Sequence, residues 1–121
     1  MRLIQEIGYT VKVGQDEAHQ RWVTENDAAL HAAAPAGSKY IGTFAVVVST
    51  EKQAGSYKQL IGLDDYATMD AIAAAAKDPN SDFGRLLRDW SEFLDTDLAA
   101  PWSSTILKDV IDATIWDPKG S

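Results

Sequence analysis

The sequence contains no cysteine, which excludes disulfides, thiolate metal ligands and a cysteine nucleophile. Its only histidines, His19 and His31, belong to one predicted helix and cannot easily share a metal ion, so we expect no metal site. There is also no Gly-rich phosphate loop, no HExxH and no GxSxG motif. The motif-bearing classes of nucleotide-binding protein, zinc protease and serine hydrolase are therefore not indicated.

Long apolar runs are absent as well. No segment approaches the roughly 20 apolar residues of a membrane span. The start of the chain, "MRLIQEIGYTVKV", is interrupted by polar residues, unlike a signal peptide. We therefore expect a cytoplasmic protein without a membrane partner.

Basic residues are few and scattered. The chain has 11 Lys and Arg against 18 Asp and Glu, a net charge of −7. This charge repels a phosphate backbone, so we expect no nucleic-acid partner. A length of 121 residues with 45% hydrophobic residues suits a single domain, 1–121.

Hydrophobic periodicity predicts an α+β fold. Alternation predicts strands and a repeat of three to four residues predicts helices. The expected elements are a strand over 3–13, a helix from Gln15 to about Ala34, strands over 39–50 and 56–63, helices over 64–78 and 83–94, and a last strand within 104–116. This order, β-α-β-β-α-(α)-β, is the ferredoxin-like arrangement with a four-stranded antiparallel sheet.

The second face of the predicted sheet is also apolar. If Tyr40, Phe44, Val46 and Val48 point at the helices, then Ile41, Ala45 and Val47 lie on the other face together with Ile4 of the first strand. A second copy of the chain is the most economical cover, and twofold dimers are the commonest homo-oligomers. We therefore expect a homodimer.

Three segments carry a resemblance to a known group of proteins. "YTVKVGQDEAHQRW" links strand to helix, "GSKYIGTF" opens the second strand, and "IGLDDYATMDAIAAAAKDP" supplies the third strand and its helix. In these the chain resembles the dimeric α/β-barrel superfamily, most of all its NIPSNAP-type branch, with the antibiotic-biosynthesis monooxygenases as relatives. The resemblance implies a dimeric barrel with a ligand pocket between sheet and helices in each subunit.

The superfamily includes cofactor-free monooxygenases, cyclases, isomerases, haem-degrading enzymes and proteins without assigned activity. The haem-degrading relatives use an Asn from the first strand and a His from a later helix. In this sequence the first strand has no Asn and the later helices have no His. Their absence argues against haem, and we expect no cofactor.

Two polar residues of the first helix are candidates for chemistry. His19, Trp22, Asn26 and Leu30 share one helix face. The helix dipole near His19 lowers the pKa of an imidazole and favours a neutral base, although His19 is equally placed to be solvated. Asn26 either binds a ligand carbonyl or hydroxyl, or is hydrogen-bonded to the sheet backbone or placed at the solvent edge. His31, near the helix end, is expected on the surface.

Aromatic residues from several elements can line a cavity for a flat ligand, or can simply form core. The expected catalytic residues are His19, Asn26 and Tyr9. The expected substrate-binding residues are Trp22, Tyr40, Tyr57 and Trp90.

Carboxylates of the sheet are further candidates. Glu6 is central in the first strand, and Asp109 and Asp112 fall in the last strand, which we expect beside the third strand rather than the first. A buried carboxylate is a candidate base. The favoured alternative is an ion pair across the sheet with a basic residue: Arg2, Lys12, Lys58 or Lys108.

Two functions follow. The first is a cofactor-independent enzyme that oxygenates, cyclises or isomerises an aromatic or polyketide-like compound. The alternative is a non-catalytic, NIPSNAP-like dimeric ligand-binding or stress-associated protein.

Overall fold

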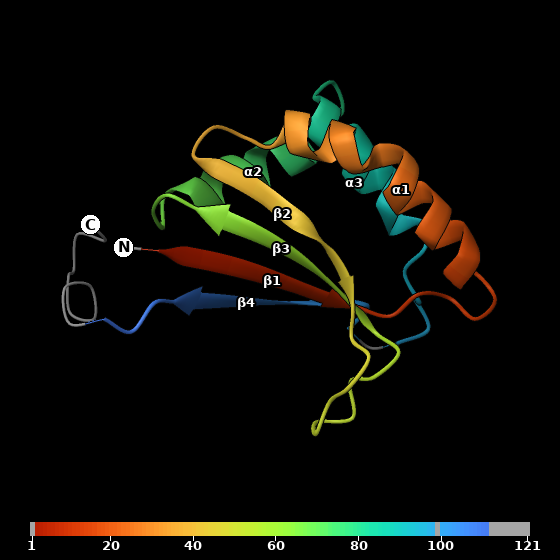
Figure 1. Ribbon diagram of the computed structural model, residues 1–121. Coiled ribbons are helices and arrows are strands. Elements are labelled where there is room, and N and C mark those ends of the chain that lie inside the picture. Colours follow the sequence, from red (N-terminus) through yellow and green to blue (C-terminus); the bar gives the residue numbers. More distant parts are fainter. Residues whose placement is uncertain (1, 99, 112–121) are drawn as a thin grey trace.

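The computed structural model describes residues 2–98 and 100–111 (Figure 1). In chain order the elements are β1 (Leu3–Tyr9), α1 (Asp16–Ala33), β2 (Ser38–Ala45), β3 (Tyr57–Leu63), α2 (Thr68–Lys77), α3 (Asp82–Ser91) and β4 (Trp102–Lys108). The predicted order of strands and helices is confirmed, including the third helix.

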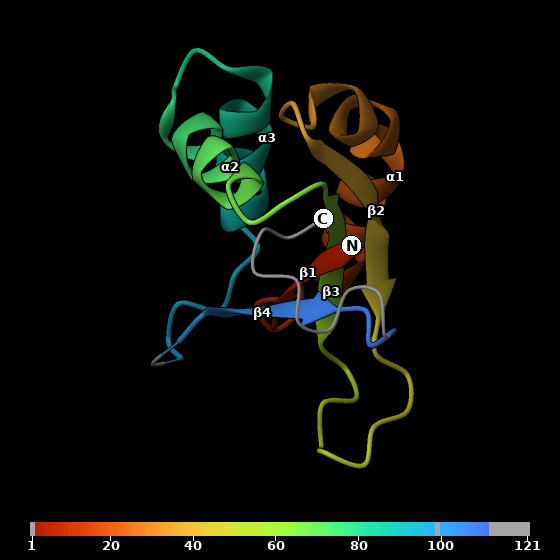
Figure 2. The same cartoon turned by 90° about the vertical axis from the view of Figure 1, so that its left-hand side faces the viewer.

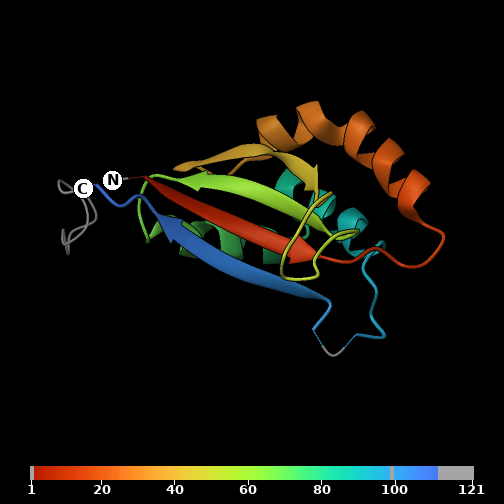
Figure 3. The ribbon, with the colours of Figure 1, turned by 60° about the horizontal axis from the view of Figure 1, so that its bottom comes forward.

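The four strands form one sheet in the order β2-β3-β1-β4, with every neighbouring pair antiparallel. This is the ferredoxin-like topology expected from the sequence. The helices lie together on one side of the sheet, here called the helix side (Figure 2). The opposite side, the outer face, is left open by the described chain (Figure 3).

One expectation about the sheet order is wrong. β4 pairs with β1, so the last strand lies beside the first strand and not beside the third. The strand also begins before the predicted range and ends at Lys108, so Asp109 follows it. Asp112 lies outside the described residues.

A β-bulge changes which side chains of β2 point toward the helices. The register with β3 shifts between Tyr40 and Gly42. Phe44 therefore pairs with Lys58 on the outer face, and Ala45 pairs with Tyr57 on the helix side, the reverse of the expectation. The strand also ends at Ala45, and Val48 beyond it is 85% exposed, so the prediction that Val46 and Val48 continue a buried strand face is wrong.

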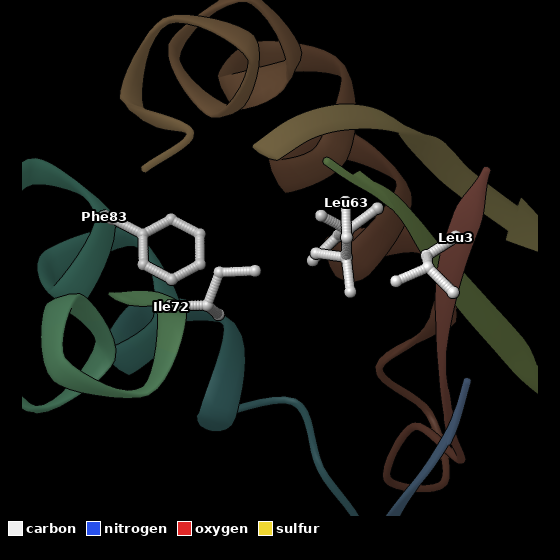
Figure 4. Close-up of a cluster of buried hydrophobic side chains, with 5 residues drawn as sticks. Leu3, Leu63, Ile72 and Phe83 are labelled. Carbon is white, nitrogen blue, oxygen red and sulfur yellow. The ribbon is translucent and has the colours of Figure 1, made fainter. Parts of the chain in front are cut away.

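The main apolar core lies between the sheet and α2 and α3. Leu3 of β1 and Leu63 of β3 face Ile72 of α2 and Phe83 of α3, and Ile61 completes the cluster (Figure 4). The strand residues alternate along β1 and β3, and Phe83 belongs to the helical repeat predicted over 83–94.

The corner between α2 and α3 is closely packed. The Ser81 side chain caps α3 by accepting a hydrogen bond from the Gly84 N–H at 2.9 Å. A Cβ on Gly84 would stand 2.2 Å from the carbonyl oxygen of Asp78. Only glycine permits this approach of the helices, which fixes α3 and its Trp90 over the sheet.

Among residues 2–98 and 100–111, no helix has both the length and the apolar character needed to cross a membrane.

Candidate functional site

Tyr9 and His19 meet where the end of β1 approaches the start of α1. Odd-numbered residues of β1 face the helices, so Tyr9 points under α1, and His19 lies on the buried side of the first helical turn. The Tyr9 hydroxyl is 2.7 Å from His19 Nε2, and the two residues are 4% and 2% exposed. The alternative of a solvated His19 is therefore excluded.

Aromatic rings surround this pair. The ring centroid of His19 lies 4.4 Å from that of Tyr57 and 5.6 Å from that of Phe93. Trp90 meets the Tyr9 ring edge to face at 5.0 Å. Side chains of β1, β3 and α3, together with Phe93 just after α3, thus surround the buried imidazole.

Burial keeps both members of the pair neutral. It raises the pKa of Tyr9 well above the usual range, with Trp90 and Gln59 acting in the opposite direction. Burial also lowers the pKa of His19, and the charge of Asp16 opposes that shift. At neutral pH the site therefore contains a phenol and an uncharged imidazole.

Tyr57 links the buried pair to Asp16, the first residue of α1. Its hydroxyl donates to Asp16 Oδ1 at 2.7 Å. This hydrogen bond, followed by burial, raises the pKa of Tyr57 to about 12. The hydroxyl is therefore a stable donor that fixes Asp16 at the start of α1.

A cavity of about 440 Å³ lies beside His19 and Tyr57, between α1 and β2. One wall is the first part of α1, with Val23 as its apolar residue, and the other is β2 from Thr43 to Ala45. Asp16 and Glu17 also line it and give it an acidic margin. Its volume and mixed lining are those of a small-molecule pocket.

Several buried polar atoms near the site have no hydrogen-bonding partner within the described residues. They are His19 Nδ1, Trp22 Nε1, Gln59 Nε2 and Trp90 Nε1. Such atoms are rare in native interiors, and their concentration here marks the site as polar and unsatisfied.

The other predicted site residues are distributed differently. Asn26 donates to the carbonyl oxygen of Trp22 in its own helix at 2.9 Å and does not line the cavity, so its amide bonds neither to the sheet backbone nor at the cavity wall. The Tyr40 hydroxyl is 2.5 Å from Thr43 Oγ1, while its ring packs with Leu30. Tyr40 therefore reaches the cavity only through Thr43.

Trp22 and Trp90 pack in the interior rather than in the cavity wall. Trp90 belongs to the buried cluster of Tyr9 and Leu94, and half-buried Trp22 packs against it. His31 is exposed and bonds to the Asp27 carbonyl oxygen at 2.8 Å, which confirms its surface position.

The carboxylates of the sheet are paired. Lys58 Nζ lies 2.9 Å from Glu6 Oε1 on the outer face, and Arg2 Nε lies 3.9 Å from Asp109 Oδ2. The predicted ion pairs across the sheet are confirmed for these two residues. Glu6 is on the side of the sheet opposite His19, so the two do not form one site.

Sequence reasoning missed Gln59, Phe93 as a neighbour of His19, and the cavity wall from Thr43 to Ala45. Gln59 is two residues from both Tyr57 and Ile61, and this spacing could have placed it on the same buried face. The wall in β2 could not be found this way because the bulge reverses the alternation.

Within residues 2–98 and 100–111, no three His, Cys, Asp or Glu side chains gather closely enough to hold a metal ion.

No protein-family model matches the sequence, and no curated protein matches it. The structure is similar to solved structures. A NIPSNAP family protein from Agrobacterium tumefaciens has a TM-score of 0.65 at 14% identity, covering 91% of this chain and 94% of its own. A second NIPSNAP family protein of that organism, of unknown function, has 0.64 at 12%, covering 98% and 93%. An uncharacterised NIPSNAP domain protein from Burkholderia xenovorans has 0.63 at 14%, covering 89% and 94%. At these identities the chain shares their fold.

Proposed function

We propose that this chain is a NIPSNAP-type, homodimeric domain that binds a small, largely apolar molecule in the cavity between α1 and β2, without catalysing a reaction on it. The observation that carries the proposal is the cavity of about 440 Å³ that His19 and Tyr57 border. The fold shared with NIPSNAP proteins, one of them described as of unknown function, supports binding rather than a known catalysis.

The state of His19 favours binding over catalysis. A general base needs a free nitrogen that reaches the substrate. His19 Nε2 is occupied by the Tyr9 hydroxyl, and Tyr9 itself is buried away from the cavity lining. His19 in this position is therefore better suited to a structural role in the pocket wall than to accepting a proton from a ligand.

A second candidate, cofactor-independent oxygenation, cyclisation or isomerisation, keeps one observation in its favour. The Tyr9 hydroxyl lies 2.7 Å from His19 Nε2 and can exchange a proton with the imidazole that borders the cavity. This candidate requires the ligand to be consumed, whereas the binding proposal requires it to be recovered unchanged.

The outer face of the sheet supports the dimer. Ile4 and Leu60 flank the ion pair of Glu6 with Lys58, and Phe44 and Leu107 remain 48% and 45% exposed beside them. Lys58 neutralises the charge of Glu6, which lowers the cost of covering this face. A second copy that packs its own outer face here buries apolar side chains on both sides.

The test is saturable binding of N-phenyl-1-naphthylamine, an uncharged apolar dye whose fluorescence rises in apolar pockets. We expect one dye per chain for the wild type. Ala45→Trp, which fills the cavity from β2, should abolish binding. Ala36→Trp, at an exposed position outside the cavity, is the matched control and should retain it.

Equal dye binding by both folded variants would contradict the proposal, as would the absence of saturable binding by the wild type. Mass spectrometry of the recovered dye separates binding from conversion.

A further inference from the structure

The Tyr9 hydroxyl meets an imidazole nitrogen in the interior, with His19 Nε2 2.7 Å away. The Trp90 indole and the Gln59 side chain act on Tyr9 in the direction that lowers the pKa of the phenol, although Trp90 Nε1 and Gln59 Nε2 have no hydrogen-bonding partner within the described residues. An indole nitrogen can only donate, so Trp90 offers the Tyr9 hydroxyl no acceptor.

These neighbours favour one direction for the Tyr9 hydrogen bond. A phenol has one hydrogen to give, and it cannot give it to the N–H of Trp90 or to the NH₂ of Gln59. The remaining acceptor is His19 Nε2. A neutral imidazole that accepts at Nε2 carries its own proton at Nδ1.

His19 Nδ1 is then a buried N–H without a partner. It has no hydrogen bond in the described structure, and its residue borders the cavity between α1 and β2. An unpaired buried donor destabilises the empty protein, and a ligand that accepts from it removes that cost.

We propose that Tyr9 holds His19 as the Nδ1–H tautomer and that this N–H binds the carbonyl oxygen of an uncharged ligand in the cavity. This inference rests on the proposed ligand site and names the class of its ligand. Nδ1 is covered in the empty structure, so the inference requires the imidazole to turn toward the cavity when the ligand binds.

The lining explains why the ligand is uncharged. Asp16 and Glu17 stand at the cavity and repel a carboxylate. Val23, Phe44 and Ala45 offer apolar surface for the body of the ligand. A ketone, ester or amide with an apolar body satisfies both conditions, and a carboxylic acid does not.

The first test reads the tautomer directly. Long-range ¹H–¹⁵N spectra of the uniformly labelled wild type at pH 8 distinguish the two ring nitrogens. We expect a protonated Nδ1 and an unprotonated Nε2 for His19. A protonated Nε2 would overturn the inference, and it would mean that the Gln59 amide is turned by 180° and accepts from Tyr9.

The second test compares three probes on the wild type: acetophenone, ethylbenzene and benzoate. Ethylbenzene has the same body without the acceptor, and benzoate adds a charge. We expect acetophenone to bind about tenfold more tightly than either, the ratio that one hydrogen bond supports. Equal affinity for acetophenone and ethylbenzene would overturn the inference.

Matched variants locate the donor. His19→Asn places an amide near the position of Nδ1 and should keep the preference for acetophenone, whereas His19→Gln mimics Nε2 and should lose it. N-phenyl-1-naphthylamine binding separates the two proposals. If the wild type binds the dye but does not discriminate among the probes, the carbonyl inference fails alone. If it does not bind the dye, the ligand site fails.

Discussion

The Tyr9 hydroxyl and His19 Nε2 lie 2.7 Å apart in the interior, joining the last residue of β1 to the first turn of α1. The glycine turn between these two elements brings the chain back over the sheet, and the hydrogen bond fixes that return. His19 of this pair also lines the cavity, so the same contact serves the fold and the candidate site.

Tyr9→Phe should destabilise the protein by about 1–3 kcal/mol, because His19 Nε2 then loses its buried hydrogen-bonding partner. Urea denaturation monitored by circular dichroism measures the change. Tyr66→Phe, at a residue 47% exposed, is the control and should change stability by no more than about 0.5 kcal/mol. Equal effects of the two substitutions would show that the Tyr9 hydroxyl contributes nothing.

The stability should fall as the pH drops below about 6.5. Burial lowers the pKa of His19 from its usual value of 6.5, so between the folded and unfolded pKa the unfolded chain binds more protons. The stabilisation is complete above the unfolded pKa and is lost toward the folded pKa. The groups facing His19 are Tyr9 and Tyr57, both neutral in this range, and Asp16, whose charge opposes the shift.

The pH effect is measured as the urea midpoint at pH 8 and pH 5.5. His19→Gln, which does not titrate there, should lose less stability between these two values than the wild type does. Parallel losses in both proteins would mean that His19 is not buried as described.

Leu107→Glu should dissociate the proposed dimer, because it places a charge on the apolar outer face. Light scattering should give twice 13.2 kDa for the wild type and 13.2 kDa for the variant. Ala28→Glu, on an exposed position of α1, should remain dimeric. A wild-type mass of 13.2 kDa at micromolar concentration would contradict the dimer.

Gly84→Ala should cost about 1–3 kcal/mol, since its methyl group would collide with the carbonyl oxygen of Asp78 at the corner of α2 and α3. Ser91→Ala, at an exposed position of the same helix, should be nearly neutral. Thermal denaturation compares the two. Similar melting temperatures would show that the helices can separate at this corner without cost.

Periodicity predicted the elements and one half of the site. Tyr9 and Tyr57 fall on the same strand faces as the buried apolar residues, and His19 shares a helix face with Trp22. The spacing along the sequence therefore predicts both faces. Their convergence follows from the ferredoxin-like order alone.

Other parts depend on non-local structure. The bulge in β2 exchanges the sheet faces on which Phe44 and Ala45 lie. It arises from the pairing of β2 with β3, which the local sequence does not specify. Asn26 lies on the predicted stripe, yet its amide donates to the Trp22 carbonyl oxygen one turn earlier in α1. Spacing locates a residue on a face but does not choose its hydrogen-bonding partner.

The most direct measurement for the central claim is the set of intermolecular NOEs from N-phenyl-1-naphthylamine bound to the wild type. The account predicts NOEs to the methyl groups of Val23 and Ala45, which line the cavity between α1 and β2. NOEs confined to Ile4 and Leu107 would place the dye on the outer face of the sheet and contradict the account.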